Sequence, residues 1–206
     1  MSEPTRLLLV RHGQSIWNAQ RRWQGSADPP LSEAGRAQAL ALAEAVSGED
    51  VDAVVSSDLI RARETAEIVM AEFGLTGLTI EPRFRERDVG EVSGLTVEEI
   101  DARWPGLLDQ WRAGTLLQMP GGEADITPRV TSALADLAAD PPGQVVLVVT
   151  HGGVIGAIDR HFGIAYERIG NVTGRWYDVD VEGTLTPRGR LVVDKIADAT
   201  TTTVVL

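Results

Sequence analysis

Residues 7–13 read Leu-Leu-Leu-Val-Arg-His-Gly, an apolar run that ends abruptly in polar residues and a glycine. We expect a strand from Arg6 to Val10 here. The same layout returns twice, where Val51 to Val55 precedes Ser-Ser-Asp and where Val145 to Thr150 precedes His-Gly-Gly. Runs that are apolar at consecutive positions are typical of strands buried on both faces, as in a parallel sheet covered by helices.

The segments between these runs have the apolar spacing of helices. We expect helices over residues 34–46, 59–73 and 130–138, with Ser32 as the N-cap of the first. The pattern predicts an α/β fold, a three-layer sandwich with a mostly parallel central sheet flanked by helices. Two more strands, 175–181 and 190–193, are expected on either side of a turn region from Gly183 to Gly189, and residues 200–206 are either an edge strand or a frayed tail.

The composition is that of a folded globular protein. The chain has 206 residues, of which 43% are hydrophobic and 24% charged, so neither disorder nor a fibrous repeat is expected. This length suits one sizeable core, and we expect a single domain over residues 1–206. No apolar stretch approaches the roughly 20 residues that span a bilayer. The N-terminal Met-Ser-Glu-Pro-Thr-Arg also lacks the order of a secretory signal.

The charge balance and the absence of cysteine narrow the class of protein. Thirty acidic and 19 basic residues give a net charge of −11, which repels nucleic acid and anionic lipid, so neither is an expected partner. A chain without cysteine has no disulfide and no cysteine nucleophile, which fits a reducing compartment. We therefore expect a cytoplasmic protein. The sequence leaves the oligomeric state open, a homodimer included.

Two histidines stand at the ends of predicted strands. His12 and His151 each follow such a strand and precede a glycine, and ligands of open α/β sheets bind beyond the carboxyl ends of the strands. Taken alone, a histidine at a strand end is more often a hydrogen-bonded structural residue. However, Arg11 directly precedes His12 and Arg61 lies just past the second strand. Because paired guanidinium groups bind phosphoryl oxygens, the ligand indicated is a phosphate ester.

Longer blocks around these residues resemble a known family. Residues 7–18, Leu-Leu-Leu-Val-Arg-His-Gly-Gln-Ser-Ile-Trp-Asn, are similar to the signature of the histidine phosphatase superfamily, which includes the cofactor-dependent phosphoglycerate mutases. Further matching blocks follow in the order of the family, at residues 28–32, 56–62, 84–87 and 149–153. The resemblance covers roughly residues 6–160 and implies the phosphoglycerate mutase-like fold.

The resemblance also implies roles for the matched residues. His12 would be the nucleophile that forms a phosphohistidine, with its second nitrogen bonded to an acceptor that the sequence does not identify. Arg11, Arg61 and His151 would surround the phosphoryl oxygens and stabilise their charge during transfer. Neutral donors toward the phosphate or the rim of the substrate would come from the side chains of Asn18 and Gln24 and the amide of Gly152.

Glu86 would be the proton donor to the leaving group and afterwards the base that activates water. This role needs a raised pKa, so we expect Glu86 to be partly desolvated and unpaired with an arginine. If its segment is extended, alternation directs Arg85 and Arg87 away from the face that carries Glu86. By composition alone, an acidic residue in such a charged stretch is usually solvated surface, and the assignment therefore depends on the resemblance.

Other features concern the walls of the site. Residues 104–126 are rich in glycine and proline, and we expect them to form a loop excursion over the site. Glu64 stands where the family often has glutamine and Ala124 where it often has serine, which leaves the substrate open. No cluster has the spacing of metal ligands and the arginines already supply positive charge, so we expect no metal ion and no other cofactor.

Three functions fit these motifs. We predict a metal-independent phosphomonoester hydrolase of the histidine acid phosphatase type that acts on small phosphorylated metabolites through a phosphohistidine. The alternative is a cofactor-dependent phosphoglycerate mutase, but His151 follows Glu86 by only 65 positions, and the resemblance implies that mutases carry a longer insertion there that excludes water. The third is a non-catalytic phosphate-binding protein, which would need no nucleophile and acid together.

Overall fold

Six strands form one sheet in the computed structural model, which describes residues 4–165 and 167–193. The expectation for residues 200–206 lies outside the described residues. The strands are β1 (Thr5–Arg11), β2 (Ala53–Ser56), β3 (Thr79–Ile80), β4 (Val145–Thr150), β5 (Gly174–Val179) and β6 (Leu185–Leu191), in the spatial order β3-β2-β4-β1-β5-β6. The first four run parallel, and β5 and β6 are antiparallel to their neighbours.

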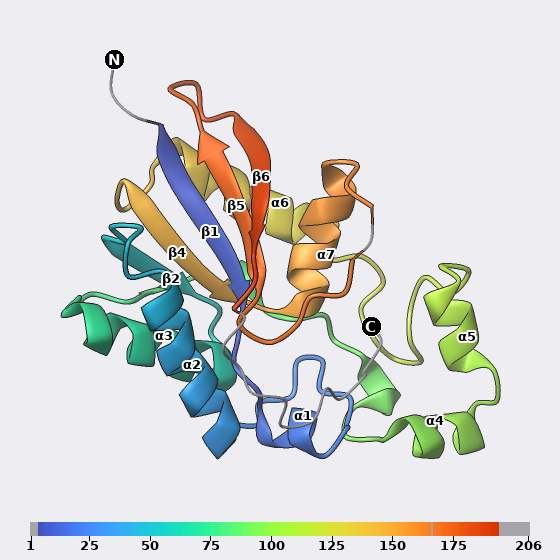
Figure 1. The fold of residues 1–206 in the computed structure, drawn as a ribbon. Coiled ribbons are helices and arrows are strands. Elements are labelled where there is room, and N and C mark those ends of the chain that lie inside the picture. Colours follow the sequence, from blue (N-terminus) through green and yellow to red (C-terminus); the bar gives the residue numbers. More distant parts are fainter. Residues whose placement is uncertain (1–3, 166, 194–206) are drawn as a thin grey trace.

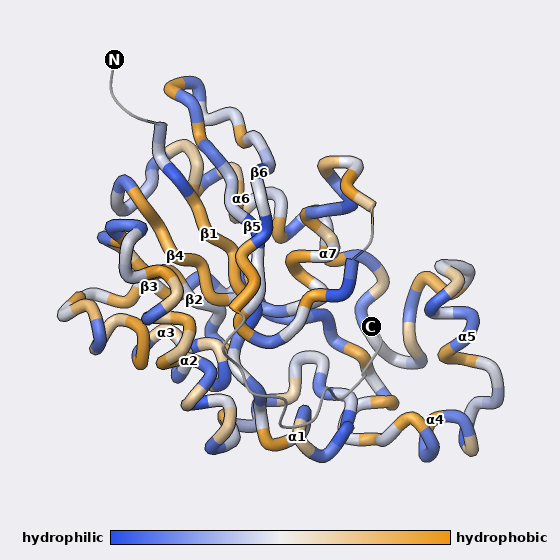
Figure 2. The backbone as a smooth tube through the Cα atoms, viewed as in Figure 1, coloured by the Kyte–Doolittle hydropathy of each residue, from blue (hydrophilic) through white to orange (hydrophobic). Residues whose placement is uncertain are grey.

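The consecutive apolar residues of the central strands bury both faces of the sheet. In β1, Leu7 and Leu9 belong to one buried cluster, while Leu8 and Val10 belong to a second cluster on the opposite face. All four side chains are fully buried. Figure 2 shows β1 and β4 as continuous hydrophobic segments in the middle of the molecule. An alternating pattern would have left one face for solvent, so the run predicted the layering correctly.

Helices cover both faces and complete the three-layer α/β sandwich (Figure 1). Helices α2 (Glu33–Ala45) and α3 (Ile60–Phe73) pack on one face, and α6 (Thr127–Ala139) and α7 (Gly152–His161) pack on the other. Ser32 caps α2, because its side chain accepts a hydrogen bond from the amide of Gly35. Within the described residues, no helix is both long enough and apolar enough to cross a membrane.

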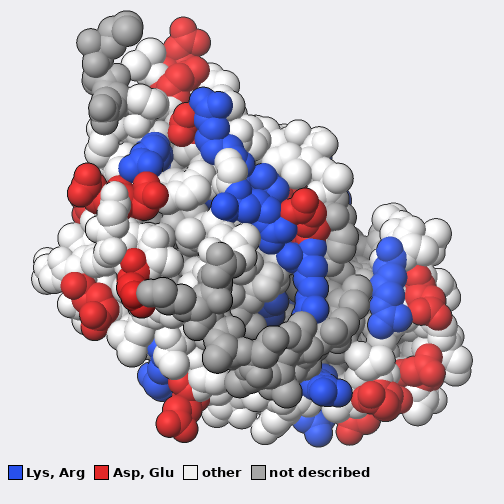
Figure 3. All heavy atoms as spheres, viewed as in Figure 1, with Lys and Arg blue, Asp and Glu red and all other residues white. Residues whose placement is uncertain are grey.

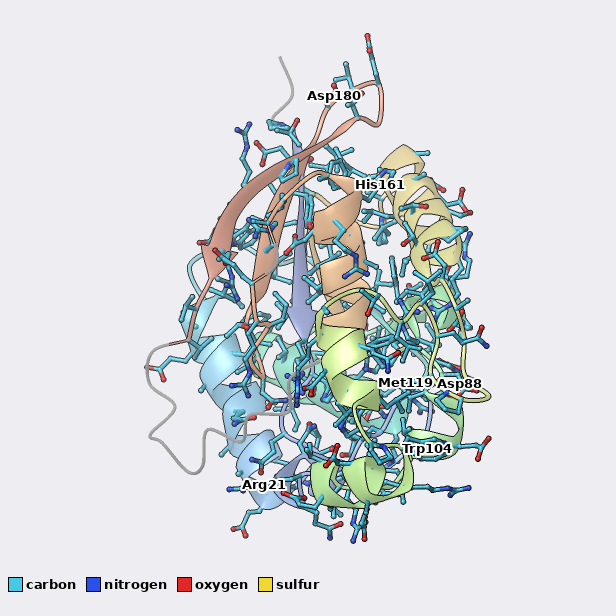
Figure 4. The ribbon with its side chains drawn as sticks, turned by 90° about the vertical axis from the view of Figure 1, so that its right-hand side faces the viewer. Arg21, Asp88, Trp104, Met119, His161 and Asp180 are labelled. Carbon is cyan, nitrogen blue, oxygen red and sulfur yellow. The ribbon has the colours of Figure 1, made fainter. Side chains whose placement is uncertain are left out.

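A smaller lobe contains the segment expected as a loop excursion. The lobe includes two short helices, α4 (Val97–Arg103) just before that segment and α5 (Leu107–Arg112) within it, so the segment is partly helical and not only loop. The 3-10 turns η1 (Pro82–Phe84) and η2 (Gly90–Val92) lead into it. The core of the lobe consists of Trp23, Val89, Val92, Ile100, Leu108 and Met119. Figure 4 shows Trp104 and Met119 in this lobe, far from His161, which is the last residue of α7.

The turn predicted between the last two strands was too long. The chain reverses between Val179 and Leu185, and Gly189 lies within β6. The side chain of Asp180 accepts hydrogen bonds from the amides of Glu182 and Thr184, which closes a tight turn. Since β6 is an edge strand, it tolerates a glycine and a proline that would weaken a central strand.

The sheet has a switch in connection direction between β1 and β4. These strands are neighbours, but the chain after β1 leads to α2 on one face and the chain after β4 leads to α7 on the other. Ligands of open α/β sheets bind in the crevice that such a divergence creates at the carboxyl ends of the strands. The first and last polar motifs of the sequence lie at this crevice.

Candidate active site

The two predicted histidines lie side by side because their strands are paired in register. Arg11 at the end of β1 is opposite Thr150 at the end of β4, so the next residues, His12 and His151, leave the sheet together. Their ring centroids are 5.1 Å apart at an interplanar angle of 61°. Both side chains are buried, with 2% and 0% of their surface exposed.

Hydrogen bonds determine which nitrogen of His12 carries the proton. Nδ1 lies 2.6 Å from the carbonyl oxygen of Gly13, and Nε of Arg61 donates to Nε2 over 3.1 Å. Because a guanidinium N–H only donates, Nε2 must accept, and Nδ1–H donates to Gly13. The acceptor that the sequence left open is therefore the carbonyl of the neighbouring residue. Nε2 is therefore unprotonated, and its lone pair accepts the hydrogen bond from Arg61 at the pocket.

Arg61 is the best fixed of the predicted cations. It lies in the first turn of α3, is 1% exposed, and donates through Nη1 to the carbonyl of Ala27 at 2.6 Å and through Nη2 to that of Gly25 at 2.8 Å. Burial lowers the pKa of its guanidinium to about 10, so the group stays charged at neutral pH. The hydroxyl of Thr65 joins α3 to the exit of β1, because it accepts from the Gly13 amide.

Burial also sets the charge state of the two imidazoles. It lowers the pKa of His12 and of His151 well below the usual value for histidine, and the positive charge of Arg61 lowers both further. Both rings are therefore neutral at neutral pH. A neutral imidazole keeps the lone pair that a protonated ring lacks, and this suits His12 to act as a nucleophile.

His151 is held by a serine to which the sequence analysis gave no role. Its Nε2 lies 2.8 Å from Oγ of Ser57, a buried residue that follows β2. Oγ of Ser57 also accepts from the amide of Leu59 at 3.3 Å, so its own proton is available to Nε2. The other nitrogen of His151, Nδ1, is buried and has no hydrogen-bond partner among the described residues.

Glu86 approaches the same crevice from the segment after η1. It is buried, with 8% exposed, and its carboxylate accepts from the amides of Gly153 at 3.0 Å and Arg87 at 2.8 Å. Within the described chain it forms no ion pair, since Arg85 pairs with Asp58 and the side chain of Arg87 bonds to backbone carbonyls. A side chain at position 153 would collide with this carboxylate, which explains the second glycine of the His-Gly-Gly motif.

The two predicted amide side chains, those of Asn18 and Gln24, line the pocket and are held through their oxygens. Oδ1 of Asn18 accepts from the amide of Ser15 at 3.2 Å, and Oε1 of Gln24 accepts from the hydroxyl of Ser15 at 2.5 Å. Both amide oxygens are thereby occupied, and the NH₂ groups are left as donors. Ser15 also caps the short helix α1 (Ile16–Ala19) and thus fixes both amides, although no role had been assigned to it.

A pocket of about 630 Å³ lies over these groups. Seven of the eight predicted site residues line it: Arg11, His12, Asn18, Gln24, Arg61, Glu86 and Gly152. The eighth, His151, is fully buried beside His12 and is not among the residues that line the pocket. Arg11, whose Nη1 donates to the carbonyl of Ile169 at 2.8 Å, completes the basic lining around His12. Among the described residues, no group of three or more His, Asp or Glu side chains could hold a metal ion.

The expectation that both arginines beside Glu86 turn away from it was half right. The side chain of Arg85 is exposed and pairs with Asp58, whereas Arg87 lines the pocket together with Glu86. Strict alternation fails here because the segment leaves a 3-10 turn and forms no strand. Arg87 therefore belongs to the wall of the site, which the sequence did not indicate.

Fold and site together define an α/β protein with paired histidines and paired arginines at the carboxyl ends of its central strands. Comparison with known proteins narrows this class. The model of the histidine phosphatase superfamily (branch 1) matches residues 7–174, and the chain belongs to this superfamily.

Relatives of both expected activities are found. The chain is 39% identical over 163 residues to glucosyl-3-phosphoglycerate phosphatase of Mycobacterium tuberculosis, covering 74% of this chain and 73% of that protein. It is also 39% identical over 161 residues to 2,3-bisphosphoglycerate-dependent phosphoglycerate mutase of Methylobacterium radiotolerans, covering 74% and 76%. Among solved structures, mycobacterial glucosyl-3-phosphoglycerate phosphatase in complex with VO3 matches with a TM-score of 0.77 at 34% identity, covering 84% of this chain and 92% of the other.

Proposed function

We propose that this chain is a phosphomonoester hydrolase in which His12 takes the phosphoryl group from a small phosphorylated substrate. The observation that carries the proposal is the state of His12: a neutral ring, a proton fixed on Nδ1, and a lone pair on Nε2 at a basic pocket. A carboxyl group, Glu86, lines the same pocket without an ion pair. Nucleophile, cationic donors and acid are thus within one cavity.

In the first step, Nε2 of His12 attacks phosphorus in line with the ester oxygen. The N–P bond forms, the P–O bond to the leaving group breaks, and the protonated carboxyl of Glu86 gives its proton to that oxygen. The product alcohol leaves. The positive charge that develops on the ring is stabilised at Nδ1–H by the carbonyl of Gly13, 2.6 Å away.

In the second step, water attacks the phosphohistidine. The carboxylate of Glu86 takes a proton from the water, a new P–O bond forms, and the P–N bond breaks to return a neutral imidazole and inorganic phosphate. Glu86 is then protonated and ready for the next substrate. The amides of Gly153 and Arg87 hold its carboxyl group in place during both steps.

Hydrogen-bond donors held by the fold would stabilise the phosphoryl oxygens. Arg11 and Arg61 supply charge, and the NH₂ groups of Asn18 and Gln24 and the first-turn amide of Gly152 supply neutral hydrogen bonds. Nδ1 of His151, which is buried without a hydrogen-bond partner among the described residues, would donate to a phosphoryl oxygen. Arg61 would shift its Nε–H bond from His12 to the substrate.

Hydrolysis is favoured over mutase activity by the size of the lobe. Only 65 positions lie from Glu86 to His151, and α4 and α5 are the helices of the lobe among the described residues. A mutase must keep water from its phosphohistidine, and the family resemblance implies that mutases do so with a longer insertion at this place. The relatives do not decide between the activities, because a phosphatase and a mutase are equally similar to this chain.

Turnover of p-nitrophenyl phosphate and 3-phosphoglycerate tests the proposal, with phosphate release and isomerisation measured separately. We expect phosphate from both esters and no isomerised product. Isomerisation without phosphate release would support the mutase, and no turnover at all would support a non-catalytic phosphate-binding protein. His12→Ala should abolish release without loss of the circular dichroism of the fold. His161→Ala, which removes the exposed histidine at the end of α7, should retain activity.

A further inference from the structure

Positive charge is concentrated in the pocket far beyond what a single phosphoryl group requires. Seven of the 19 basic residues of the chain line it, against two carboxylates, Glu86 and Asp125, although the net charge of the chain is −11. Figure 3 shows basic side chains gathered across the middle of one face and again on α5, with most acidic side chains toward the edges. Arg11 and Arg61 belong to the surroundings of His12, so other arginines need a separate explanation.

Of the five remaining arginines, two are paired with acids, and a third, Arg168, also interacts with another group. Arg22 lies 3.0 Å from Glu99, and Arg112 lies 2.9 Å from Asp109. Arg87 and Arg160 differ from them. The side chain of Arg87 donates only to the backbone carbonyls of Glu123 and Ala124, and the side chain of Arg160 forms no hydrogen bond or ion pair within the described part of the chain. The charges of these two guanidinium groups are therefore not neutralised by direct pairing.

The geometry of α7 directs Arg160 into the pocket. Gly153, Gly156 and Arg160 share one face of the helix and all line the cavity. Helical side chains lean toward the N-terminus of their helix, and Nη1 of Arg160 accordingly lies 3.7 Å from the position that a Cβ on Gly156 would occupy. Gly156 is about 4.5 Å along the helix from Gly153, which holds Glu86. The guanidinium of Arg160 is thus about one turn from the catalytic end.

Arg87, which directly follows Glu86 in the chain, lines the same pocket as Arg160. Its guanidinium lies over the ring of Trp111 on α5, 5.3 Å from the centroid. Burial lowers the pKa of Arg87, and the positive charge of Arg160 contributes in the same direction. Asp125 is near both but accepts a hydrogen bond from the amide of Thr127 and makes no ion pair within the described chain. The negative charges of Glu86 and Glu123 also act on Arg87, but Glu123 is paired with Arg129. The lining of the pocket as a whole keeps seven guanidinium groups against two carboxylates and is therefore positive.

We infer that Arg87 and Arg160 form a second anion-binding subsite, and that the substrate is a phosphomonoester carrying a second anionic group, either a carboxylate or another phosphoryl group. The inference depends on the proposed function for the first subsite, where the ester is cleaved beside His12. The second anion lies between two cations that otherwise repel each other. The apolar ring of Trp111 limits their hydration and strengthens the attraction.

Matched substrate pairs test the inference. 3-Phosphoglycerate and glycerol 3-phosphate differ in a carboxylate, and fructose 1,6-bisphosphate and fructose 6-phosphate differ in a phosphoryl group. We expect wild-type kcat/KM to be at least about tenfold higher for the two-anion member of at least one pair, and which pair responds identifies the anion. Arg160→Gln should remove most of this ratio and Arg160→Glu should reverse it. Arg63→Gln, an exposed arginine of α3, is the matched control and should preserve the ratio.

A binding measurement separates this inference from the proposed function. In the His12→Ala background, 3-phosphoglycerate and fructose 1,6-bisphosphate are titrated calorimetrically against their one-anion partners. Tighter binding of a two-anion member that Arg160→Gln abolishes supports the subsite even if wild-type protein releases no phosphate. Equal kcat/KM and equal affinity within both pairs would overturn the subsite, whereas the hydrolase would stand if phosphate were still released. An equal effect of Arg160→Gln on both members of each pair would also overturn it.

Discussion

At the scale of single residues, the tautomer of His12 depends on a backbone carbonyl, a group that every amino acid has. The carbonyl of Gly13 accepts from Nδ1 at 2.6 Å, and Arg61 donates to Nε2 at 3.1 Å. Together they select one tautomer of a buried neutral ring. The sequence offered no signal for this acceptor, because backbone carbonyls are not encoded by residue type. Only the direction of the chain after β1 brings that carbonyl back to the ring.

Gly153→Ala should displace Glu86, the proposed acid, without changing that residue itself. The new Cβ would collide with the carboxylate of Glu86 and displace it from the amide of Gly153. We expect kcat/KM for p-nitrophenyl phosphate to fall by about 10²-fold, since small displacements of a catalytic group have effects of this order. Gly48→Ala is the matched control, because no atom lies within 4 Å of a Cβ there. Unchanged kinetics in Gly153→Ala would mean that the position of Glu86 is unimportant.

The buried histidines predict how stability depends on pH. Their pKa values are lowered in the folded protein, whereas in the unfolded chain they return to about 6.5. As the pH falls below about 6.5, the unfolded state binds protons that the folded state does not, so the free energy of unfolding decreases. Urea unfolding at several pH values measures this slope.

Two variants locate the origin of that slope. The double variant His12→Asn, His151→Asn should flatten the dependence of unfolding free energy on pH in this range. His161→Asn, which removes an exposed histidine, should leave the slope in place. A wild-type protein whose stability rises as the pH falls from about 6.5 would show that the two rings are not buried in neutral form.

Residues that carry charge or end a strand could be predicted from the sequence, and residues that only position them could not. The structure brings together Arg11, His12, Arg61 and Glu86, far apart in the chain, in one pocket. Ser57 holds His151 and Ser15 holds two amides, but a serine beside a strand or a helix has many ordinary roles. Their partners are set by tertiary packing, which spacing along the chain does not contain.

At the scale of elements, α7 is anchored to the antiparallel part of the sheet by a buried ion pair. Asp159 on α7 lies 2.8 Å from Arg175 on β5, and the two side chains are 3% and 11% exposed. The hydroxyl of Tyr177 also donates to Asp159, at 3.3 Å. The helix that presents Gly152 and Gly153 to the site is thereby fixed along its length.

Asp159→Ala should therefore destabilise the protein by roughly 3–5 kcal/mol, because it leaves the charge of Arg175 buried without a partner. The matched control is Asp178→Ala, which removes an acid from an ion pair with Arg188 whose side chains are 26% and 55% exposed. We expect this control to change stability by less than about 1 kcal/mol. Equal losses in the two variants, measured by urea unfolding, would contradict the assigned role of Asp159.

The apolar spacing of the sequence predicted the main helices and strands, but it misplaced the edge strand β6 and missed the short helices of the lobe. The central strands and the three long helices agree with the pattern to within a few residues. The strand β6 was placed too late because Pro187 and Gly189 resemble turn residues, although an exposed edge strand accepts both. The short helices of the lobe have too few residues for a periodic signal.

At the scale of the whole molecule, the acidic surface and the basic pocket have opposite effects on ligands. The net charge of −11 repels anions at a distance, while the arginines of the pocket attract them at short range. A small anionic ester can enter this cavity, whereas a long polyanion would meet the surrounding acidic surface. This difference favours small metabolites over nucleic acid as substrates.

Positive charge from arginine also bears on the need for metal ions. We predict that EDTA leaves kcat and KM for p-nitrophenyl phosphate unchanged, because guanidinium groups stabilise the phosphoryl charge and no described cluster could hold a metal ion. Assays with and without chelator, followed by addition of Mg²⁺ or Zn²⁺, provide the check. Activity that is lost in EDTA and restored by either ion would contradict this prediction.

Direct capture of the phosphorylated enzyme tests the central claim that Nε2 of His12 forms the covalent bond to phosphorus. Protein mixed with a ³²P-labelled ester is quenched in alkali, where phosphohistidine survives, and the labelled peptide is sequenced by mass spectrometry. We expect the label on His12 in the wild-type protein and none in His12→Asn. A label on any other residue, or its persistence in His12→Asn, would contradict the account.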